Sequence, residues 1–154
     1  MRGIAALAVA SVAVGLASGQ TRACQSGFVE VGGECLAFLA SYGTWDTQLQ
    51  SCTMVGGSLA KVTGDLHNAV YQHIIGSELT DKCFWIGGSD RLTEGQWKWE
   101  SDQTDIPLGG PHWDPCEPEP EGGNSENYLA ICPSMYYYKD YPGSSLHYAI
   151  CQIF

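Results

Sequence analysis

The chain has 154 residues, a formal net charge of −10 and 17 acidic against 7 basic side chains. Nucleic acid is therefore not an expected partner, because phosphate backbones are bound by clustered Lys and Arg. The residues beyond the N-terminal leader suffice for one compact domain with its own core, and no linker or second apolar segment divides them.

The N-terminus has the layout of a secretory signal peptide. A basic residue precedes an apolar run over residues 4–16, and small residues follow as far as Gly19. The run is shorter than the ~18 residues that a membrane span needs, so we expect no membrane anchor. We expect a signal peptide at 1–19 and one domain at 20–154; cleavage just before Cys24 is the alternative. Cleavage after Gly19 removes one basic and no acidic residue, which takes the net charge to −11.

Seven cysteines in an exported chain of this length indicate a disulfide framework. No Cys-x-x-Cys pair occurs, which argues against a redox or zinc motif. An odd number leaves at least one cysteine without an intrachain partner.

The first half of the domain predicts a hairpin followed by two helices. Two β-prone runs, 28–31 and 34–38, flank a Gly-Gly turn. Thr44 is the expected N-cap of a helix that runs to Met54, where glycines end it. Thr63 is the expected N-cap of a second helix that ends at Gly76.

The second half predicts short strands and one long loop. The loop spans residues 106–126 and is rich in Pro, Gly and carboxylates. Helices followed by a strand-rich half indicate the α+β class. The expected strand segments are 84–88, 96–99, 128–132, 136–138 and 148–151.

Five segments in the same order resemble the C-type lectin domain family, and together they cover nearly all of the predicted domain. The Trp85-Ile86-Gly87-Gly88 segment resembles the core motif of the family, in which large side chains fill the core and glycines allow close packing. The resemblance implies a C-type lectin-like fold: two helices and a small antiparallel β-structure with a long ligand-binding loop, stapled by disulfides. The other segments are 24–38, 45–60, 94–99 and 149–151.

The resemblance also implies disulfide pairs. It pairs Cys52 with Cys151 and Cys24 with Cys35. The two cysteines of a further family bridge are replaced here by Tyr128 and Gly143. That loss leaves three cysteines outside the pattern, for which we expect a Cys116–Cys132 bridge with Cys83 buried and free; the other pairings stay open.

In this family a tripeptide in the long loop and the strand after it supply oxygens to a calcium ion that also holds sugar hydroxyls, which suits the six to eight hard ligands that Ca²⁺ prefers. The tripeptide here is Glu-Pro-Glu in one of two registers, of which we prefer Glu119-Pro120-Glu121 to Glu117-Pro118-Glu119. Neither matches the tripeptides associated with mannose-type or galactose-type sugars, so the sequence does not predict a sugar class. The resemblance implies that the carbohydrate-binding residues are Glu119, Glu121, Glu126, Asn127 and Asp140, and that calcium is held by Glu119, Glu121, Glu126 and Asp140.

Lys139 conflicts with this calcium site, because it stands where the family has an Asn ligand and an ammonium group has no lone pair. Two alternatives follow. Either Lys139 points to solvent and Ca²⁺ remains the cofactor, or its charge replaces the metal among the carboxylates. Trp113, and Tyr138 or Tyr141 beside Asp140, are candidates for stacking on a sugar ring.

The sequence contains no motif of a hydrolase, a metalloprotease or a phosphate-binding enzyme, so we do not expect an enzyme. The resemblance implies a secreted, extracellular lectin that binds glycans, in particular microbial surface polysaccharide in innate immunity, and that forms homo-oligomers in some cases. The alternative is a lectin-like module that binds a protein, a mineral or ice without sugar or calcium.

Overall fold

The structure is a computed structural model that describes residues 23–116 and 119–154, so the predicted signal peptide at 1–19 lies outside the described residues. Within this described part no helix is both long enough and apolar enough to span a membrane. In chain order the elements are β1 (Val29–Val31), β2 (Glu34–Gly43), α1 (Trp45–Met54), β3 (Ser58–Leu59), α2 (Asp65–Ile75), β4 (Phe84–Ser89), β5 (Lys98–Trp99), the 3₁₀ turn η1 (Gly123–Ser125), β6 (Tyr128–Ile131), β7 (Tyr138–Tyr141) and β8 (His147–Gln152).

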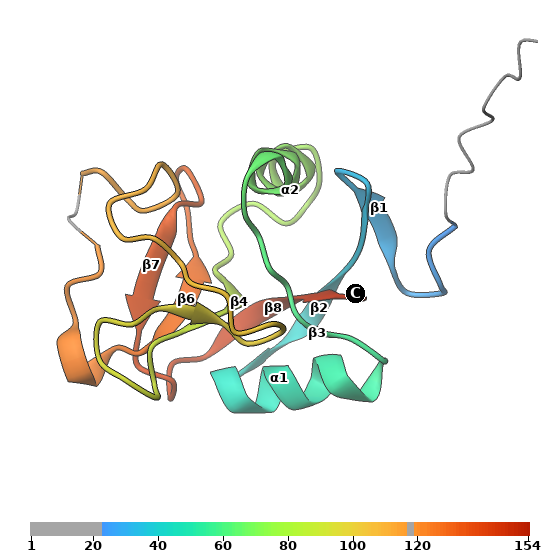
Figure 1. Cartoon of the computed structure of the whole chain (residues 1–154). Coiled ribbons are helices and arrows are strands. Elements are labelled where there is room, and N and C mark those ends of the chain that lie inside the picture. The colour runs from blue at the N-terminus through green and yellow to red at the C-terminus, as the bar shows by residue number, and fades with distance from the viewer. Residues whose placement is uncertain (1–22, 117–118) are drawn as a thin grey trace, which may run out of the picture.

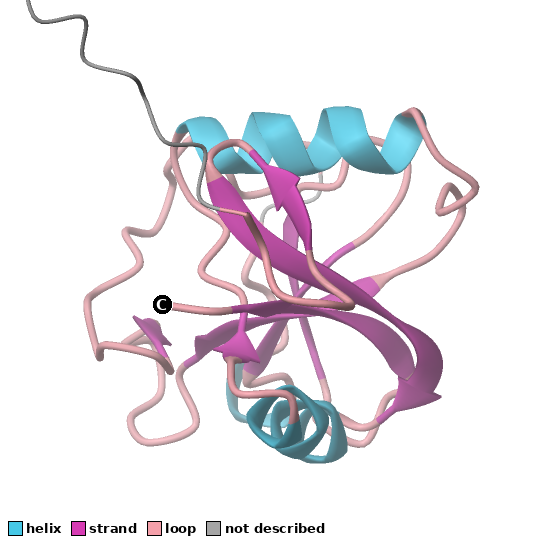
Figure 2. Cartoon of the chain, turned by 90° about the vertical axis from the view of Figure 1, so that its right-hand side faces the viewer, coloured by secondary structure: helices cyan, strands magenta, loops and turns pink. Residues whose placement is uncertain are grey.

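The strands form one sheet with the order β1-β2-β8-β4-β6-β7, while β3 pairs with β8 and β5 pairs with β4. Strands β4 and β8 are parallel, and the other pairs are antiparallel. The two helices lie on opposite sides of β2 and β8 (Figures 1 and 2). This arrangement confirms the α+β class with two helices and a largely antiparallel sheet.

The first helix begins where the sequence predicts, and the second begins slightly later. The Thr44 side chain accepts a hydrogen bond from the backbone N–H of Thr47 (3.3 Å) and caps α1. The predicted cap at Thr63 is wrong, because α2 is entered through Gly64 and has no side-chain cap. Gly64 has φ +55°, a conformation that glycine adopts without the Cβ clash of other residues.

The Trp-Ile-Gly-Gly segment forms β4 at the centre of the core, as its resemblance to the family motif implies. Trp85 and Ile86 are fully buried. The Trp85 Nε1–H donates to the Gly43 carbonyl (2.9 Å), which ties β4 to the end of β2. A Cβ on Gly87 would lie 2.7 Å from the Leu59 carbonyl oxygen, so the close approach of β4 to β3 requires a glycine there.

Two strand predictions need correction. The predicted strand at 136–138 is shifted, because Tyr136 has φ +57° and breaks the extended backbone, so that β7 starts only at Tyr138. The alternation at 96–99 is confirmed in burial, since Trp97 and Trp99 are both 3% exposed, but only Lys98–Trp99 pairs as a strand.

Two of the predicted disulfides are confirmed: Cys24–Cys35 and Cys52–Cys151. The predicted Cys116–Cys132 bridge is wrong, and so is the free Cys83, because Cys83 pairs with Cys132 and Cys116 is exposed and free. The physical reason is the register of β4 against β6. It places Phe84 opposite Ile131. Cys83, which precedes Phe84, therefore faces Cys132, which follows Ile131, with a Cα–Cα distance of 4.3 Å.

The place of the missing family bridge is filled by an aromatic ring. A Cβ on Gly143 would lie 2.5 Å from Tyr128 Cε2, so the Tyr128 ring rests directly on the glycine. The Tyr128 ring also packs near Trp45, with centroids 4.8 Å apart. Packing of a ring against a glycine thus replaces the covalent link between the two segments.

Candidate functional site

The long loop is fastened to the start of β7 by backbone hydrogen bonds. The Tyr138 N–H donates to the His112 carbonyl (2.7 Å), and the Asp114 N–H donates to the Tyr138 carbonyl (3.3 Å). The Trp113 Nε1–H donates to the Pro107 carbonyl (3.0 Å), which closes the loop on itself. As a result Asp114, 25 positions away in the sequence, lies beside Lys139.

Lys139 points into a cluster of carboxylates. Its Nζ lies 3.3 Å from Asp114 Oδ2 and 4.0 Å from Glu119 Oε1. The side chain of Lys139 is 16% exposed, and those of Asp114 and Glu119 are 17% and 5% exposed. The ammonium group is therefore largely withdrawn from solvent, as expected of a lysine that replaces a metal ion.

Glu119 leads the tripeptide in the preferred register, and the peptide bond that joins it to Pro120 is cis. Glu119 Oε2 lies 3.5 Å from the backbone N of Asp140. The Asp140 carboxylate accepts hydrogen bonds from the backbone N–H groups of Glu121 (3.3 Å) and Gly122 (3.0 Å). The loop is thus bound to β7 from both sides. The alternative register starts within residues 117–118, which lie outside the described residues.

The carboxylates of this cluster compete for positive charge. Burial, a hydrogen bond to the Asp140 carboxylate and repulsion by that carboxylate raise the pKa of Glu119 to about 8, and Lys139 offsets only part of this. Burial and repulsion by Asp140 and Glu121 raise the pKa of Glu126. At neutral pH Glu119 therefore retains its proton and is hydrogen-bonded to the Asp140 carboxylate, while Lys139 forms an ion pair with Asp114.

A calcium ion does not fit this arrangement. The part of the chain that is described contains no group of three or more His, Cys, Asp or Glu side chains placed to hold a metal. The Lys139 ammonium group lies 4.0 Å from Glu119, one of the carboxylates predicted to hold the ion, and it would repel the metal. Both Asp140 oxygens already accept backbone hydrogen bonds.

The remaining predicted residues lie on the outer side of the loop. Glu121 is exposed, and Glu126 packs over Gly122. Asn127, with its amide oriented to satisfy its donors, donates to Asp90 Oδ1 (3.1 Å) and to the Gly123 carbonyl (3.3 Å). Asn127 therefore connects the end of the loop to the segment after β4.

Two of these residues were not predicted from the sequence. Asp114 forms an ion pair with Lys139 (3.3 Å), and Asp90 accepts hydrogen bonds from Asn127 and from the Gly95 N–H (2.8 Å). The sequence held one signal for Asp114: a Lys139 side chain that turns inward needs a counter-ion. The signal did not identify which of the many carboxylates in the chain supplies it.

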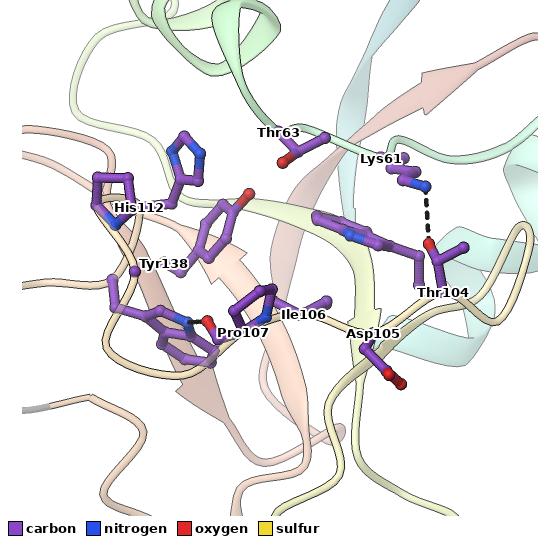
Figure 3. Close-up of a pocket in the computed structure, with 12 residues that line it drawn as sticks. Lys61, Thr63, Thr104, Asp105, Ile106, Pro107, His112 and Tyr138 are labelled. Carbon is purple, nitrogen blue, oxygen red and sulfur yellow. Dashed lines mark hydrogen bonds between the residues drawn. The ribbon is translucent and has the colours of Figure 1, made fainter.

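A cavity of about 380 Å³ opens between β5, the long loop and β7 (Figure 3). Trp99, Trp113 and Tyr138 line it, and each is at most 4% exposed. The Tyr138 hydroxyl donates to the Val62 carbonyl, so its polar end is satisfied by the protein. These rings form the walls of a narrow pocket, and neither Tyr138 nor Trp113 is the open stacking platform that the sequence analysis considered.

The family model for the lectin C-type domain matches residues 41–153, so the chain belongs to the C-type lectin domain family. Members of this family are carbohydrate-binding proteins without enzymatic activity, which agrees with the expectation of no enzyme. The chain is 26% identical over 105 residues to a perlucin-like protein of Mytilus galloprovincialis, covering 68% of this chain and 65% of the relative.

Two further comparisons define the range of relatives. The chain is 27% identical over 101 residues to ladderlectin of Oncorhynchus mykiss, covering 65% of this chain and 52% of that protein. A solved structure of a calcium-independent type II antifreeze protein superposes with a TM-score of 0.65 at 25% identity, over 84% of this chain and 93% of that one. The chain thus spans about half to two thirds of the length of the curated relatives described.

Proposed function

We propose that this chain is a secreted, extracellular lectin that binds glycans through its long loop without a bridging calcium ion. The observation that carries the proposal is the Lys139 ammonium group, 3.3 Å from Asp114 Oδ2 and 4.0 Å from Glu119 Oε1, at the place where calcium-binding relatives have an Asn ligand. Family membership supports the lectin role, and the apolar leader at 1–19 supports secretion.

The proposed division of labour follows from exposure. Glu119 and Asp140 are turned inward and hold the loop on β7, whereas Glu121, Glu126 and Asn127 lie closer to solvent. Carboxylate and amide oxygens accept hydrogen bonds from sugar hydroxyls directly, so a glycan does not need a metal to be held. Polysaccharide on microbial surfaces is the proposed ligand class, because it presents many copies of one sugar, which a homo-oligomer of this chain would bind at several sites at once.

A glycan array in the presence of calcium and in the presence of EDTA tests this proposal. We expect the same sugars to bind under both conditions, and we expect Glu121→Gln with Glu126→Gln to weaken binding. Glu30→Gln is the matched control, since Glu30 is exposed on β1. Absence of glycan binding in both conditions would refute the lectin role, and binding that EDTA abolishes would refute the metal-free mechanism.

Ice binding is a second candidate, favoured by the similarity to a calcium-independent antifreeze protein at 25% identity. An ice-binding surface requires no metal and no unpaired charge, which is compatible with an internally neutralised lysine. Thermal hysteresis of the purified protein in EDTA distinguishes the two candidates. A measurable hysteresis with an empty glycan array would favour ice binding over the lectin role.

A further inference from the structure

Two histidines join the long loop to helix α2. His67 on α2 and His112 in the loop face each other with their Nδ1 atoms 2.7 Å apart. The Nε2 atom of His67 lies 2.6 Å from the Tyr136 carbonyl oxygen. The Gly64 backbone N–H donates to the Nε2 atom of His112 (3.2 Å). All four ring nitrogens therefore have a partner.

The partners assign the hydrogen positions. The Gly64 N–H is a donor, so His112 Nε2 is bare and His112 carries its hydrogen on Nδ1. That hydrogen is donated to His67 Nδ1, which must then be bare. His67 consequently carries its hydrogen on Nε2 and donates it to the Tyr136 carbonyl. This arrangement satisfies every contact, and both rings are neutral in it.

An additional proton breaks the chain of hydrogen bonds wherever it binds. On His67 Nδ1 it would face the Nδ1–H of His112. If His112 then moved its own hydrogen to Nε2, that hydrogen would face the Gly64 N–H. Two donors in contact repel each other, so an added proton weakens the contact between the loop and the helix.

The surroundings do not stabilise a charge on either ring. Burial lowers the pKa of His67, and repulsion by His112 adds to this, while the hydrogen bond to Tyr136 opposes it. Burial likewise lowers the pKa of His112. The titratable groups in contact with the pair or lining the cavities beside it include four tyrosines and two charged side chains. Asp105 and Lys61 line the same cavity as His112, but Asp105 is paired with Lys98 and Lys61 is paired with Asp102. The tyrosines are Tyr71 on α2, Tyr136 and Tyr137 before β7, and Tyr138 on β7.

We propose that His67 and His112 are positioning residues that hold the long loop in its binding conformation at neutral pH and release it on acidification. The connection to the binding site is short. The His112 carbonyl accepts from the Tyr138 N–H (2.7 Å), and Asp114, two residues further on, pairs with Lys139. The loss of glycan affinity on release rests on the proposed function, whereas the release itself does not.

The pH range follows from the direction of the shifts. Both folded-state pKa values lie below the ordinary value of about 6.5. The stabilisation is therefore fully present above about pH 6.5 and is lost as the pH falls through the folded-state values.

Nitrogen-resolved NMR of the imidazoles tests the hydrogen assignment directly. At pH 7.5 we expect His67 to be the Nε2–H tautomer and His112 the Nδ1–H tautomer. Hydrogen exchange of the backbone over residues 110–114, corrected for the intrinsic effect of pH, should become at least about tenfold faster at pH 5 than at pH 7.5. Unchanged corrected exchange, or the opposite tautomers, would overturn the proposal.

Variants separate a titrating role from a merely structural one. His67→Gln keeps a donor for the Tyr136 carbonyl but does not titrate, so the pH dependence of exchange over residues 110–114 should fall to the part that His112 contributes. His73→Gln is the control, because His73 lies on the same helix and stacks on Phe38. A His67→Gln profile as steep as that of the wild type would overturn the proposal even if the variant is less stable.

The glycan readout distinguishes the two proposals. Binding at pH 7.5 that falls at pH 5 together with faster loop exchange supports both. Loop release in a protein that binds no glycan at either pH refutes the proposed function and supports the positioning pair. Glycan binding that persists at pH 5 with a firmly held loop refutes the pair and leaves the lectin function intact.

Discussion

Replacing Lys139 by asparagine restores the neutral oxygen donor that calcium-binding relatives carry at this position. We expect Lys139→Asn to be less stable than the wild type in EDTA and to recover stability when calcium is added. The wild type should show no such gain. The reason is that the ammonium group now occupies the space among Asp114 and Glu119 that a metal ion would share.

The size of the loss can be worked from the contact with Asp114. At 3.3 Å and an effective dielectric constant of about 20, the attraction is about 5 kcal/mol. Relief of the lysine desolvation and a new hydrogen bond from the Asn amide offset part of this, the latter by about 1 kcal/mol. The expected net loss in the free energy of unfolding is about 1–3 kcal/mol. Calcium at 100 times its dissociation constant would return about 2.7 kcal/mol.

Urea denaturation of the wild type, Lys139→Asn and Lys139→Met, each in EDTA and in excess calcium, measures these terms. Lys139→Met is the matched control, because it removes the charge without supplying an oxygen. It should lose a similar free energy and gain nothing from calcium. Equal stabilisation of wild type and Lys139→Asn by calcium would show that the lysine does not replace the metal, and the reasoning would fail.

Three further experiments test the packing and charge of the domain. Cys83→Ser with Cys132→Ser opens a loop with a sequence separation of 49 and should lower the free energy of unfolding by about 4 kcal/mol in the chain-entropy treatment, as measured by urea denaturation under oxidising conditions. Gly143→Ala should be destabilising because its Cβ meets the Tyr128 ring, and Gly143→Ala with Tyr128→Ala should be less destabilising than the sum of the single changes. Glu119→Gln should flatten the pH dependence of stability between about pH 5 and 9: the wild-type carboxyl has a pKa of about 8 when folded and ionises earlier when unfolded, so wild-type stability falls as the pH rises through this range.

The fold could be predicted because its signals are local or depend on packing composition. Thr44 caps α1 through a hydrogen bond within one turn. Trp85 fills the core and Gly87 allows close packing, and both roles could be predicted from the residue type alone. The wrong prediction of a helix cap at Thr63 also has a local cause. The next residue is glycine, and its free backbone moves the start of α2 by one position without needing a side-chain cap.

The third disulfide could not be predicted, because it depends on a strand register that no local pattern determines. Cys83 and Cys132 face each other only because β4 and β6 pair with Phe84 opposite Ile131. A shift of the register by one residue would turn the neighbouring side chains to the other face of the sheet. The sequence showed that three cysteines lacked family partners but did not determine which two would meet.

The candidate site likewise has residues that could be predicted from the sequence and one that could not. Glu119, Lys139 and Asp140 were identified from their positions relative to the family motif, and the structure brings them together. Asp114 was not identified, because its approach to Lys139 depends on the loop running beside the start of β7. The orientation of Lys139 was left open for the same reason. A lysine side chain turns inward only where a counter-ion is present, and the sequence did not identify the counter-ion.

Charge balance gives a physical basis for the proposed metal-free loop. Asp114 and Glu119 lie beside the Lys139 ammonium group, and Glu119 is also hydrogen-bonded to the Asp140 carboxyl, whereas a calcium ion at this place would contribute two positive charges. Here the Lys139 ammonium supplies one, and the proton retained by Glu119, whose pKa is raised to about 8, supplies the other. The same repulsion is thus relieved by two monovalent charges in place of one divalent ion. Lys139→Asn removes the ammonium group but leaves the proton on Glu119, which calcium must displace. Calcium binding to this variant should therefore release a proton from Glu119, and the calcium affinity should increase as the pH rises toward 8.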